Sequence, residues 1–205
     1  SKEENMTKLN LSKGLIAGIL ISLGGAAFLA SEDKLVGSVL FTLGLTAICY
    51  RGDNLFTGKI CYCLPGENQV RPDEILAGLI GNFIATVLFG LMIGFASDGI
   101  AEKATSVVDA KLLLDLWTVF ARGILCGLLI FISVDVFKKK ATVVSIMLCI
   151  PAFILSGWEH SIADMFYFSA AGEFTGKALL FIFVVILGNS VGGVIIPLLE
   201  KMQRE

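Results

Sequence analysis

The only histidine of the chain, His160, lies in a short polar stretch that interrupts an apolar region. Glu159 precedes it and Asp164 follows four residues later, whereas the flanking sequence is almost free of charge. Histidine exchanges protons near neutral pH because its unperturbed pKa is ~6.5. Inside a membrane segment, ionisable groups are costly and usually face a cavity or a charged partner. The stretch therefore indicates a functional polar site.

A second polar break lies at residues 51–58, where Gly52, Asp53 and Asn54 favour a turn. If this break is surrounded by hydrocarbon, its freed backbone amides must bind protein groups or line a wet cavity. Thr57 adds a hydroxyl group to the same place. Taken alone, the break could also be an ordinary cytoplasmic turn after a short helix.

Catalysis and metal binding are poorly supported by these residues. His160 and Asp164 could present two ligands on one helical face, but the chain has no other histidine and no cysteine placed to complete a zinc site. Ser156 near His160 suggests a serine hydrolase, but nothing marks that serine as lying on a strained turn. The five cysteines are expected to be small buried apolar residues. We therefore expect no enzyme, no metal and no cofactor.

The elements that position these residues are long apolar segments. The chain has 205 residues, 56% of them hydrophobic and 17% charged, whereas soluble domains have ~25% charged residues. No segment is basic and aromatic enough to bind nucleic acid. Charge-poor segments cover residues 12–31, 35–50, 75–97, 112–137, 141–157 and 174–199. Because a membrane helix needs ~20 residues, we predict an all-α membrane protein of six transmembrane helices, the second and fifth of them short and broken.

The basic residues predict the orientation in the membrane. They gather at both ends of the chain and after the second and fourth segments, as Lys2, Lys8, Lys13, Lys59, Arg71, Lys138, Lys139, Lys140, Lys201 and Arg204. In the alternate loops, Lys34 and Lys103 stand beside acidic residues. Since cytoplasmic loops are rich in lysine and arginine, both termini are predicted to be cytoplasmic, with the protein in the plasma or inner membrane.

Two weak internal similarities suggest a duplication. Lys13–Ile21 resembles Arg122–Ile130 at an offset of 122 − 13 = 109, and Gly81-Asn82 matches Gly188-Asn189 at 188 − 81 = 107. We therefore predict one transmembrane domain, residues 1–205, made of repeats at about 12–97 and 109–199. With three spans each, the repeats must be inverted, and such folds place their site near the midplane, where interrupted helices meet.

At these positions the sequence resembles the formate/nitrite transporter family, which includes formate, nitrite and hydrosulfide channels. The resemblance rests on Leu55-Phe56-Thr57-Gly58 in the first break, on the stretch from Gly157 to Met165 in the second, and on Gly81-Asn82 and Gly188-Asn189. It implies an aquaporin-like protomer, a homopentamer in the lipid bilayer, and one pore for small anions in each protomer.

The resemblance also implies roles for single residues. Thr57 and His160 would line the pore centre, Lys111 would draw anions toward the outer mouth, and Glu159 and Asn189 would support the centre. The implied outer constriction consists of Phe41, Leu45 and Phe153, and the inner one of Leu55 and Phe56. The chain departs from the family at Gly127 and Asp164, where asparagine is common, and at Asp53-Asn54, where a small and then an acidic residue are usual.

These expectations lead to a passive, pH-sensitive channel for small monovalent weak-acid anions such as formate, nitrite or hydrosulfide. Backbone amides and the Thr57 hydroxyl could replace the water around the ion, or the anion could take up a proton and cross as a neutral acid. One alternative is a proton-coupled transporter of the same fold. A neutral-solute pore of the aquaporin kind would have paired Asn-Pro-Ala elements, which the sequence lacks. A purely structural membrane protein would not explain the two polar breaks.

Overall fold

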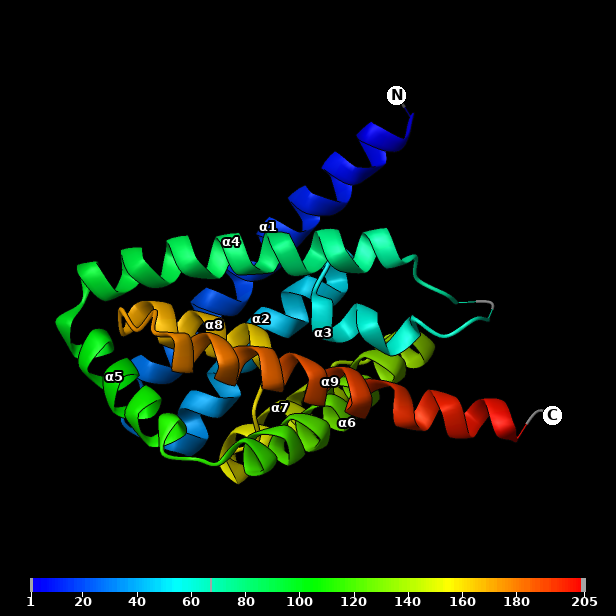
Figure 1. Ribbon diagram of the computed structural model, residues 1–205. Coiled ribbons are helices and arrows are strands. Elements are labelled where there is room, and N and C mark those ends of the chain that lie inside the picture. Colours follow the sequence, from blue (N-terminus) through cyan, green and yellow to red (C-terminus); the bar gives the residue numbers. More distant parts are fainter. Residues whose placement is uncertain (1, 67, 204–205) are drawn as a thin grey trace.

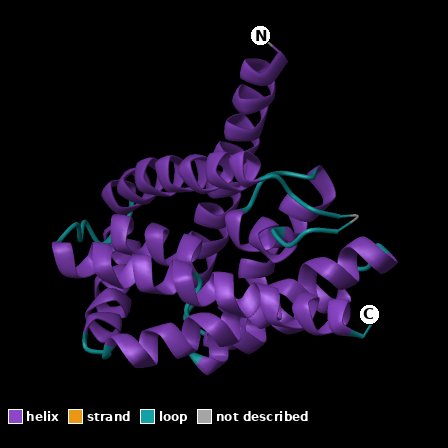
Figure 2. Cartoon of the chain, turned by 45° about the vertical axis from the view of Figure 1, so that its right-hand side comes forward, coloured by secondary structure: helices purple, strands orange, loops and turns teal. Residues whose placement is uncertain are grey.

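The computed structural model describes residues 2–66 and 68–203, with side chains from residue 4 onward. Arg204 and the side chain of Lys2, which entered the prediction of orientation, lie outside this description. The described residues form helices and loops and contain no strand (Figures 1 and 2). The elements are α1 (Lys2–Ala30), α2 (Lys34–Arg51), α3 (Phe56–Lys59), the short 3-10 helix η1 (Ile60–Tyr62), α4 (Pro72–Ala96), α5 (Asp98–Leu112), α6 (Leu116–Lys140), α7 (Val144–Ser156), α8 (Ser161–Ala170) and α9 (Gly176–Met202).

The helices confirm the prediction of an all-α membrane protein. In the described part of the chain, five helices are long and apolar enough to span a membrane: Glu4–Ala30, Lys34–Arg51, Pro72–Ala96, Leu116–Lys140 and Gly176–Met202. The pair Val144–Ser156 and Ser161–Ala170 meets the same criterion when taken together and is bent by 57° at its break. Counted as one span, this bent pair brings the number to six, and it lies where the sequence predicted the broken fifth segment.

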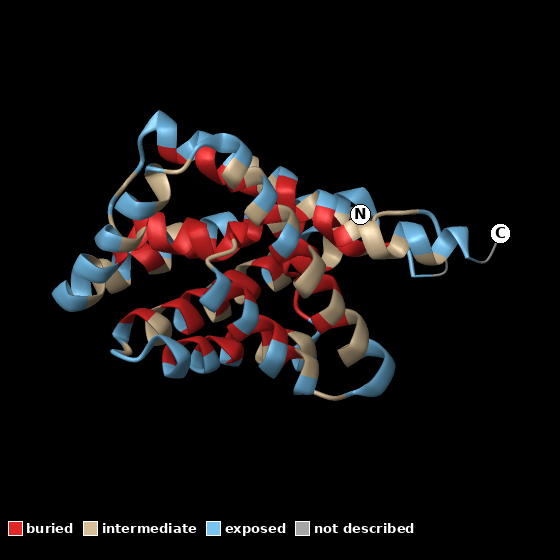
Figure 3. Ribbon diagram, turned by 90° about the horizontal axis from the view of Figure 1, so that it is seen from below, coloured by how far each residue is buried: buried red, intermediate tan, exposed pale blue. Residues whose placement is uncertain are grey.

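Outward-facing apolar side chains are what a lipid environment requires. Leu88, Leu148 and Phe183 are 60%, 67% and 56% exposed, which would be unfavourable in water over so wide a surface. Buried residues gather in the middle of the molecule, and exposed ones on its periphery (Figure 3). The interior is thus reserved for helix contacts and for the polar residues described below.

Two helix pairs, α1 with α4 and α6 with α9, cross at matching glycines. A Cβ atom on Gly18 of α1 would lie 2.8 Å from the Asn82 carbonyl oxygen of α4, and one on Gly127 of α6 would lie 2.4 Å from the Asn189 carbonyl oxygen of α9. Small residues allow such close approach of backbones in membranes. The structure therefore places Gly127, one of the positions where the chain departs from the family pattern, in the contact between α6 and α9.

Helix α5 was not predicted, because its charged residues made residues 98–111 look like a loop. Ala104 and Val108, four residues apart on one face, are buried, and that face holds the helix against the protein. Helix α6 consequently starts at Leu116, later than the predicted 112. At the other end of the chain, α1 begins well before the predicted residue 12.

Candidate functional site

Each of the two polar breaks begins at a left-handed glycine. Helix α2 ends at Gly52, with φ of 69°, and α7 ends at Gly157, with φ of 71°. Glycine adopts this conformation without the steric cost that a Cβ atom brings. A new helix begins four residues after each glycine, at Phe56 (56 − 52) and at Ser161 (161 − 157). The two turns therefore bring the N-termini of α3 and α8 into the protein interior.

Two buried asparagines hold these N-termini in the same way. The Asn82 side chain accepts a hydrogen bond from the backbone N–H of Phe56 at 2.9 Å and donates to the carbonyl groups of Gly14 and Asn54 at 2.8 and 3.0 Å. Both amide hydrogens and the amide oxygen are thereby used within the protein. The bonds tie the first break to α1 and α4.

The second break repeats this pattern with Asn189. Its side chain accepts from the Ser161 N–H at 2.8 Å and donates to the carbonyl groups of Gly123 and Glu159 at 2.9 and 2.8 Å. Asn189 was predicted to support the centre, and the structure bonds it to the residues on either side of His160. Its bonds satisfy backbone groups that would otherwise be orphaned in a dry interior.

Thr57 and His160 meet between the two breaks. The Thr57 Oγ1 and His160 Nε2 atoms are 2.9 Å apart, and both residues are buried. His160 caps α8, because its Nδ1 atom accepts a hydrogen bond from the Ala163 N–H at 3.1 Å. A neutral imidazole that accepts at Nδ1 must carry its proton at Nε2. His160 therefore donates to Thr57, and the hydrogen of the Thr57 hydroxyl is left to donate elsewhere.

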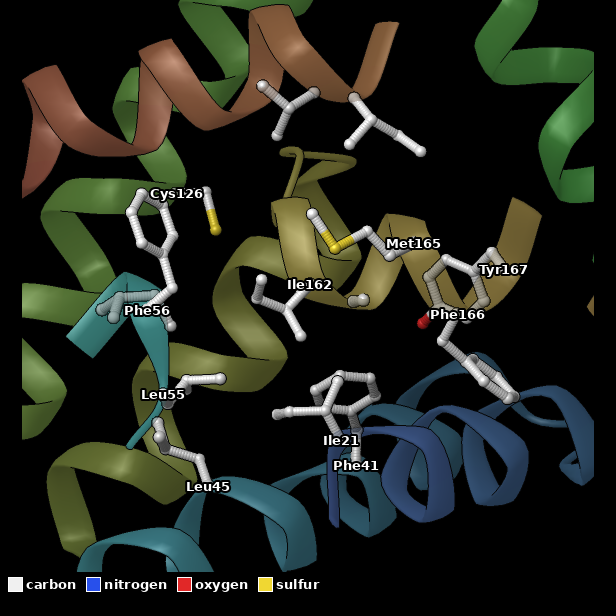
Figure 4. Packing of buried hydrophobic residues seen from close by; sticks show 14 of the residues in the cluster. Ile21, Phe41, Leu45, Leu55, Phe56, Cys126, Ile162, Met165, Phe166 and Tyr167 are labelled. Carbon is white, nitrogen blue, oxygen red and sulfur yellow. The ribbon is translucent and has the colours of Figure 1, made fainter. Parts of the chain in front are cut away.

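Apolar side chains surround this polar pair. The Phe153 ring stacks on the His160 ring with centroids 5.7 Å apart, and Phe41 meets Phe153 edge-on at 6.3 Å. Leu55 and Phe56 precede Thr57 and are buried as well (Figure 4). The five residues predicted to form constrictions are Phe41, Leu45, Leu55, Phe56 and Phe153, and all belong to one buried cluster around the centre.

Two cavities lie toward opposite ends of α6. The Lys111 cavity, of about 260 Å³, is lined by Lys111, Arg122, Phe153, Glu159, His160 and Asp164, among others. The Lys59 cavity, of about 110 Å³, is lined by Leu45, Asp53, Leu55, Lys59, Val134 and Lys138, among others. Leu45, which was predicted beside Phe41 and Phe153, thus faces the same cavity as Leu55. It lies one helical turn beyond Phe41 (45 − 41 = 4), and that turn carries it past the centre.

The Lys111 cavity contains a buried charge cluster. The Lys111 ammonium contacts the Glu159 carboxylate and lies 2.9 Å from Asp164 Oδ1. Arg122 Nη1 is 3.8 Å from the other oxygen of Glu159. Burial alone would lower the pKa of Lys111, but the carboxylates of Asp164 and Glu159 outweigh burial and raise this pKa above its usual range. Lys111 therefore stays charged beside the cavity.

Sequence reasoning missed part of this cluster. Lys111 and Glu159 were expected near the pore, but their direct contact was not, and Asp164 stood out only as a departure from the family pattern. One oxygen of Asp164, Oδ2, is buried and has no hydrogen-bond partner. The i, i+4 spacing of His160 and Asp164 was the available signal, and in the sequence it suggested only metal binding.

A buried hydroxyl–imidazole pair lies between two cavities, where two polar breaks meet inside a bundle of apolar helices. This arrangement is typical of a membrane channel or transporter. A family model described as "Formate/nitrite transporter" matches residues 1–201. The chain belongs to the formate/nitrite transporter family.

Proteins of known description agree with this assignment. The chain is 28% identical to the nitrite transporter NirC of Salmonella typhimurium over 200 residues, covering 86% of this chain and 73% of NirC. It is 23% identical to the formate channel FocA of Haemophilus influenzae over 183 residues, covering 77% of this chain and 64% of FocA. These relatives are transporters and channels, not enzymes.

Solved structures share the fold. A structure described as an "FNT family ion channel" aligns over 99% of this chain and 92% of its own, with a TM-score of 0.83 and 21% identity. A second, described as a "Pentameric formate channel with formate bound", aligns over 98% of this chain and 97% of its own, with a TM-score of 0.80 and 20% identity. The described helices therefore adopt the architecture of this channel family.

Proposed function

We propose that the protein is a passive, pH-sensitive channel for small monovalent weak-acid anions such as formate, nitrite or hydrosulfide. The observation that carries this proposal is the buried contact between Thr57 and His160, 2.9 Å long and situated between two cavities. The similarity to a nitrite transporter and to a formate channel supports this substrate class.

The apolar residues around the centre act as two constrictions in this proposal. Phe41 and Phe153 narrow the path on the side of the Lys111 cavity, and Leu55 and Phe56, joined by Leu45, narrow it on the side of the Lys59 cavity. Moving an anion without its water into such an apolar constriction costs several kcal/mol. A hydrated ion is therefore excluded, and passage requires either replacement of its water by protein donors or transient protonation.

The centre supplies a donor for an anion. Because His160 donates through Nε2 to Thr57 Oγ1, the Thr57 hydroxyl is free to donate its own hydrogen to a passing solute. Lys111 attracts the anion into its cavity through long-range electrostatics, which act strongly where walls are apolar. Lys111 contributes charge, and Thr57 contributes the short-range contact.

We further propose the inverted-repeat architecture, with repeats at about 12–97 and 109–199 in one domain. The matching bonds of Asn82 and Asn189 support it, since each joins the start of a short helix to a glycine carbonyl on the first helix of its half. A homopentamer in the plasma or inner membrane, with both termini cytoplasmic, is the corresponding assembly, and one of the structural relatives is a pentameric channel.

A proton-coupled anion transporter of the same fold is the second candidate. The buried carboxylates of Glu159 and Asp164 beside the Lys111 cavity favour it, because carboxyl groups can carry protons. A pore for neutral solutes fits less well with a lysine at the cavity wall.

Anion flux in proteoliposomes tests the proposed function. Formate, nitrite and hydrosulfide are compared between about pH 5 and pH 8, the range in which histidine titrates, for the native chain and for His160→Asn. Selective flux that depends on pH and changes with the substitution supports the channel. Absence of anion flux at every pH, with intact and inserted protein, rules it out. Stoichiometric movement of protons against a gradient would favour the transporter.

A further inference from the structure

The charge cluster of the Lys111 cavity has more negative than positive charge in its core. Lys111 contributes +1, and Glu159 and Asp164 contribute −1 each, so the sum is +1 − 2 = −1 when all three are ionised. Both carboxylates contact the same ammonium and are only 1% exposed. A net negative buried cluster would repel the anions that the cavity is proposed to admit. Arg122, which is 36% exposed and 3.8 Å from Glu159, compensates only partly.

The two carboxylates differ in their partners. Glu159 has one oxygen on Lys111 and the other facing Arg122. Asp164 has Oδ1 on Lys111, whereas its Oδ2 is buried without a partner. Two carboxylates that share one buried site cannot both ionise without a large cost, so one of them retains a proton. Asp164 Oδ2 contacts no cation, so a proton can bind this oxygen without displacing one.

The other groups that face Asp164 do not fill this role. His160 uses Nδ1 to cap α8, and its single ring proton, at Nε2, is already bonded to Thr57. Lys111 stays charged between the two carboxylates. The remaining titratable or charged groups near the cluster are Lys34 of α2, Arg122 and Cys126 of α6, and Tyr167 of α8. None of these is a carboxylic acid, and Glu159 already faces two cations.

We propose that Asp164 and Glu159 hold one proton between them, on Asp164 Oδ2, and that a weak-acid anion takes up this proton in the Lys111 cavity before crossing as a neutral acid. The inference rests on the proposed function and names its proton source. In the step, the O–H bond of the Asp164 carboxyl breaks and a bond forms between the proton and the anion. The resulting carboxylate is reprotonated by water through the cavity that Asp164 lines.

This proton source discriminates between anions by their basicity. A weak-acid anion accepts the proton and loses its charge, whereas the anion of a strong acid of similar size does not. The latter must pass the constrictions as an ion. The presence of Asp164, where the family commonly has asparagine, would thus make the native chain more selective for weak acids at neutral pH than its Asp164→Asn variant.

Infrared difference spectroscopy on the reconstituted full chain detects the proton directly. At neutral pH, the native protein is expected to show the C=O band of a protonated carboxyl group, shifted in D₂O and diminished on addition of formate. The Asp164→Asn variant loses this band, and Asp164→Glu restores it. Asp135→Asn is the matched control, because Asp135 pairs with Lys139 outside the cavity; this variant keeps the band. A native band that is absent, or that survives in Asp164→Asn, overturns the proposal.

Flux measurements on the same vesicles separate this inference from the proposed function. Formate is compared with nitrate, the anion of a strong acid. Asp164→Asn is expected to reduce formate flux at neutral pH, to leave it nearly native at acidic pH, where water supplies protons, and to change nitrate flux little. Formate flux that is identical in both proteins at every pH overturns the inference while the channel stands. A native protein that moves no anion overturns the channel, and the spectra still decide whether the carboxyl pair holds a proton.

Discussion

Replacing Asn189 by alanine should weaken the second break more than its size suggests. The side chain makes bonds to three buried backbone groups, the Ser161 N–H and the carbonyls of Gly123 and Glu159, at 2.8–2.9 Å. Each orphaned group costs ~1 kcal/mol or more when it stays dry. The Gly123 carbonyl keeps its helical partner within α6, so two groups, the Ser161 N–H and the Glu159 carbonyl, are orphaned. The expected loss in free energy of unfolding is therefore about 2 kcal/mol.

Ser190→Ala is the matched control for this substitution. Ser190 is the next residue of α9, and its hydroxyl donates only to the Ile186 carbonyl of its own helix, at 2.7 Å. Because that carbonyl keeps its helical partner, the expected change is ~0.5 kcal/mol or less, as for most substitutions away from such features. The comparison isolates the bonds between helices from the general effect of truncating a polar side chain.

Reversible unfolding in mixed micelles, followed by circular dichroism against denaturant concentration, gives both free energies. Asn82→Ala should cost about as much as Asn189→Ala, since its bonds are equivalent. The Asn189→Ala variant should also lose anion flux, because the loop that carries His160 loses its anchor. Equal stability of the Asn189→Ala and Ser190→Ala variants would refute the claim that these asparagines hold the breaks in place.

Three further substitutions follow from the same geometry. Thr57→Val keeps the shape but removes the hydroxyl, so we expect anion flux in proteoliposomes to fall by about tenfold, as for a lost interaction of ~1.4 kcal/mol in the barrier; unchanged flux would contradict the donor role. Gly127→Ala places a Cβ atom 2.4 Å from a carbonyl oxygen of α9, and this overpacking should lower the free energy of unfolding by ~1–3 kcal/mol. A Cβ atom on Gly99 would have nothing within 4 Å, so Gly99→Ala should leave the free energy of unfolding unchanged in the same assay. Lys111→Met removes the cation that the Glu159 and Asp164 carboxyl groups share and should lower the thermal midpoint. The loss should be larger at high pH than at low pH, because protonation removes the unpaired negative charge. A change in midpoint that is the same at every pH would contradict the role of Lys111 in this cluster.

The sequence was sufficient to predict both breaks because their causes are local. Gly52 and Gly157 occupy left-handed positions that favour glycine, and the polar residues after them could not continue an apolar span. The five helices that could span a membrane and the bent pair were likewise readable from charge-poor segments near the ~20 residues that a membrane helix needs. The resemblance to a family then suggested that Thr57 and His160 lie together, and in the structure they are 2.9 Å apart.

The parts that were missed depend on contacts between distant segments. A charged segment such as residues 98–111 is held as a helix when another part of the protein covers its apolar residues, Ala104 and Val108. No local pattern in the sequence shows which part that is. The position of Leu45 beside Leu55 depends on how far α2 runs past the centre. The bond between Lys111 and Asp164 joins residues 53 positions apart (164 − 111), and only the packed structure shows that one ammonium serves two carboxylates.

The two breaks have the same backbone arrangement but carry different side chains. This difference explains why the protein has a single polar centre. Subtracting 105 from the second break aligns Gly157 with Gly52 and Ser161 with Phe56, so His160 aligns with Leu55. Thr57 aligns by the same offset with Ile162, which is buried. Each break therefore contributes one polar side chain opposite an apolar one, and the two polar groups bond to each other. A histidine at both positions would place two ionisable rings in the buried interior and raise the cost of desolvation. The arrangement that is present keeps one polar contact, between His160 and Thr57, within a cluster of buried apolar residues.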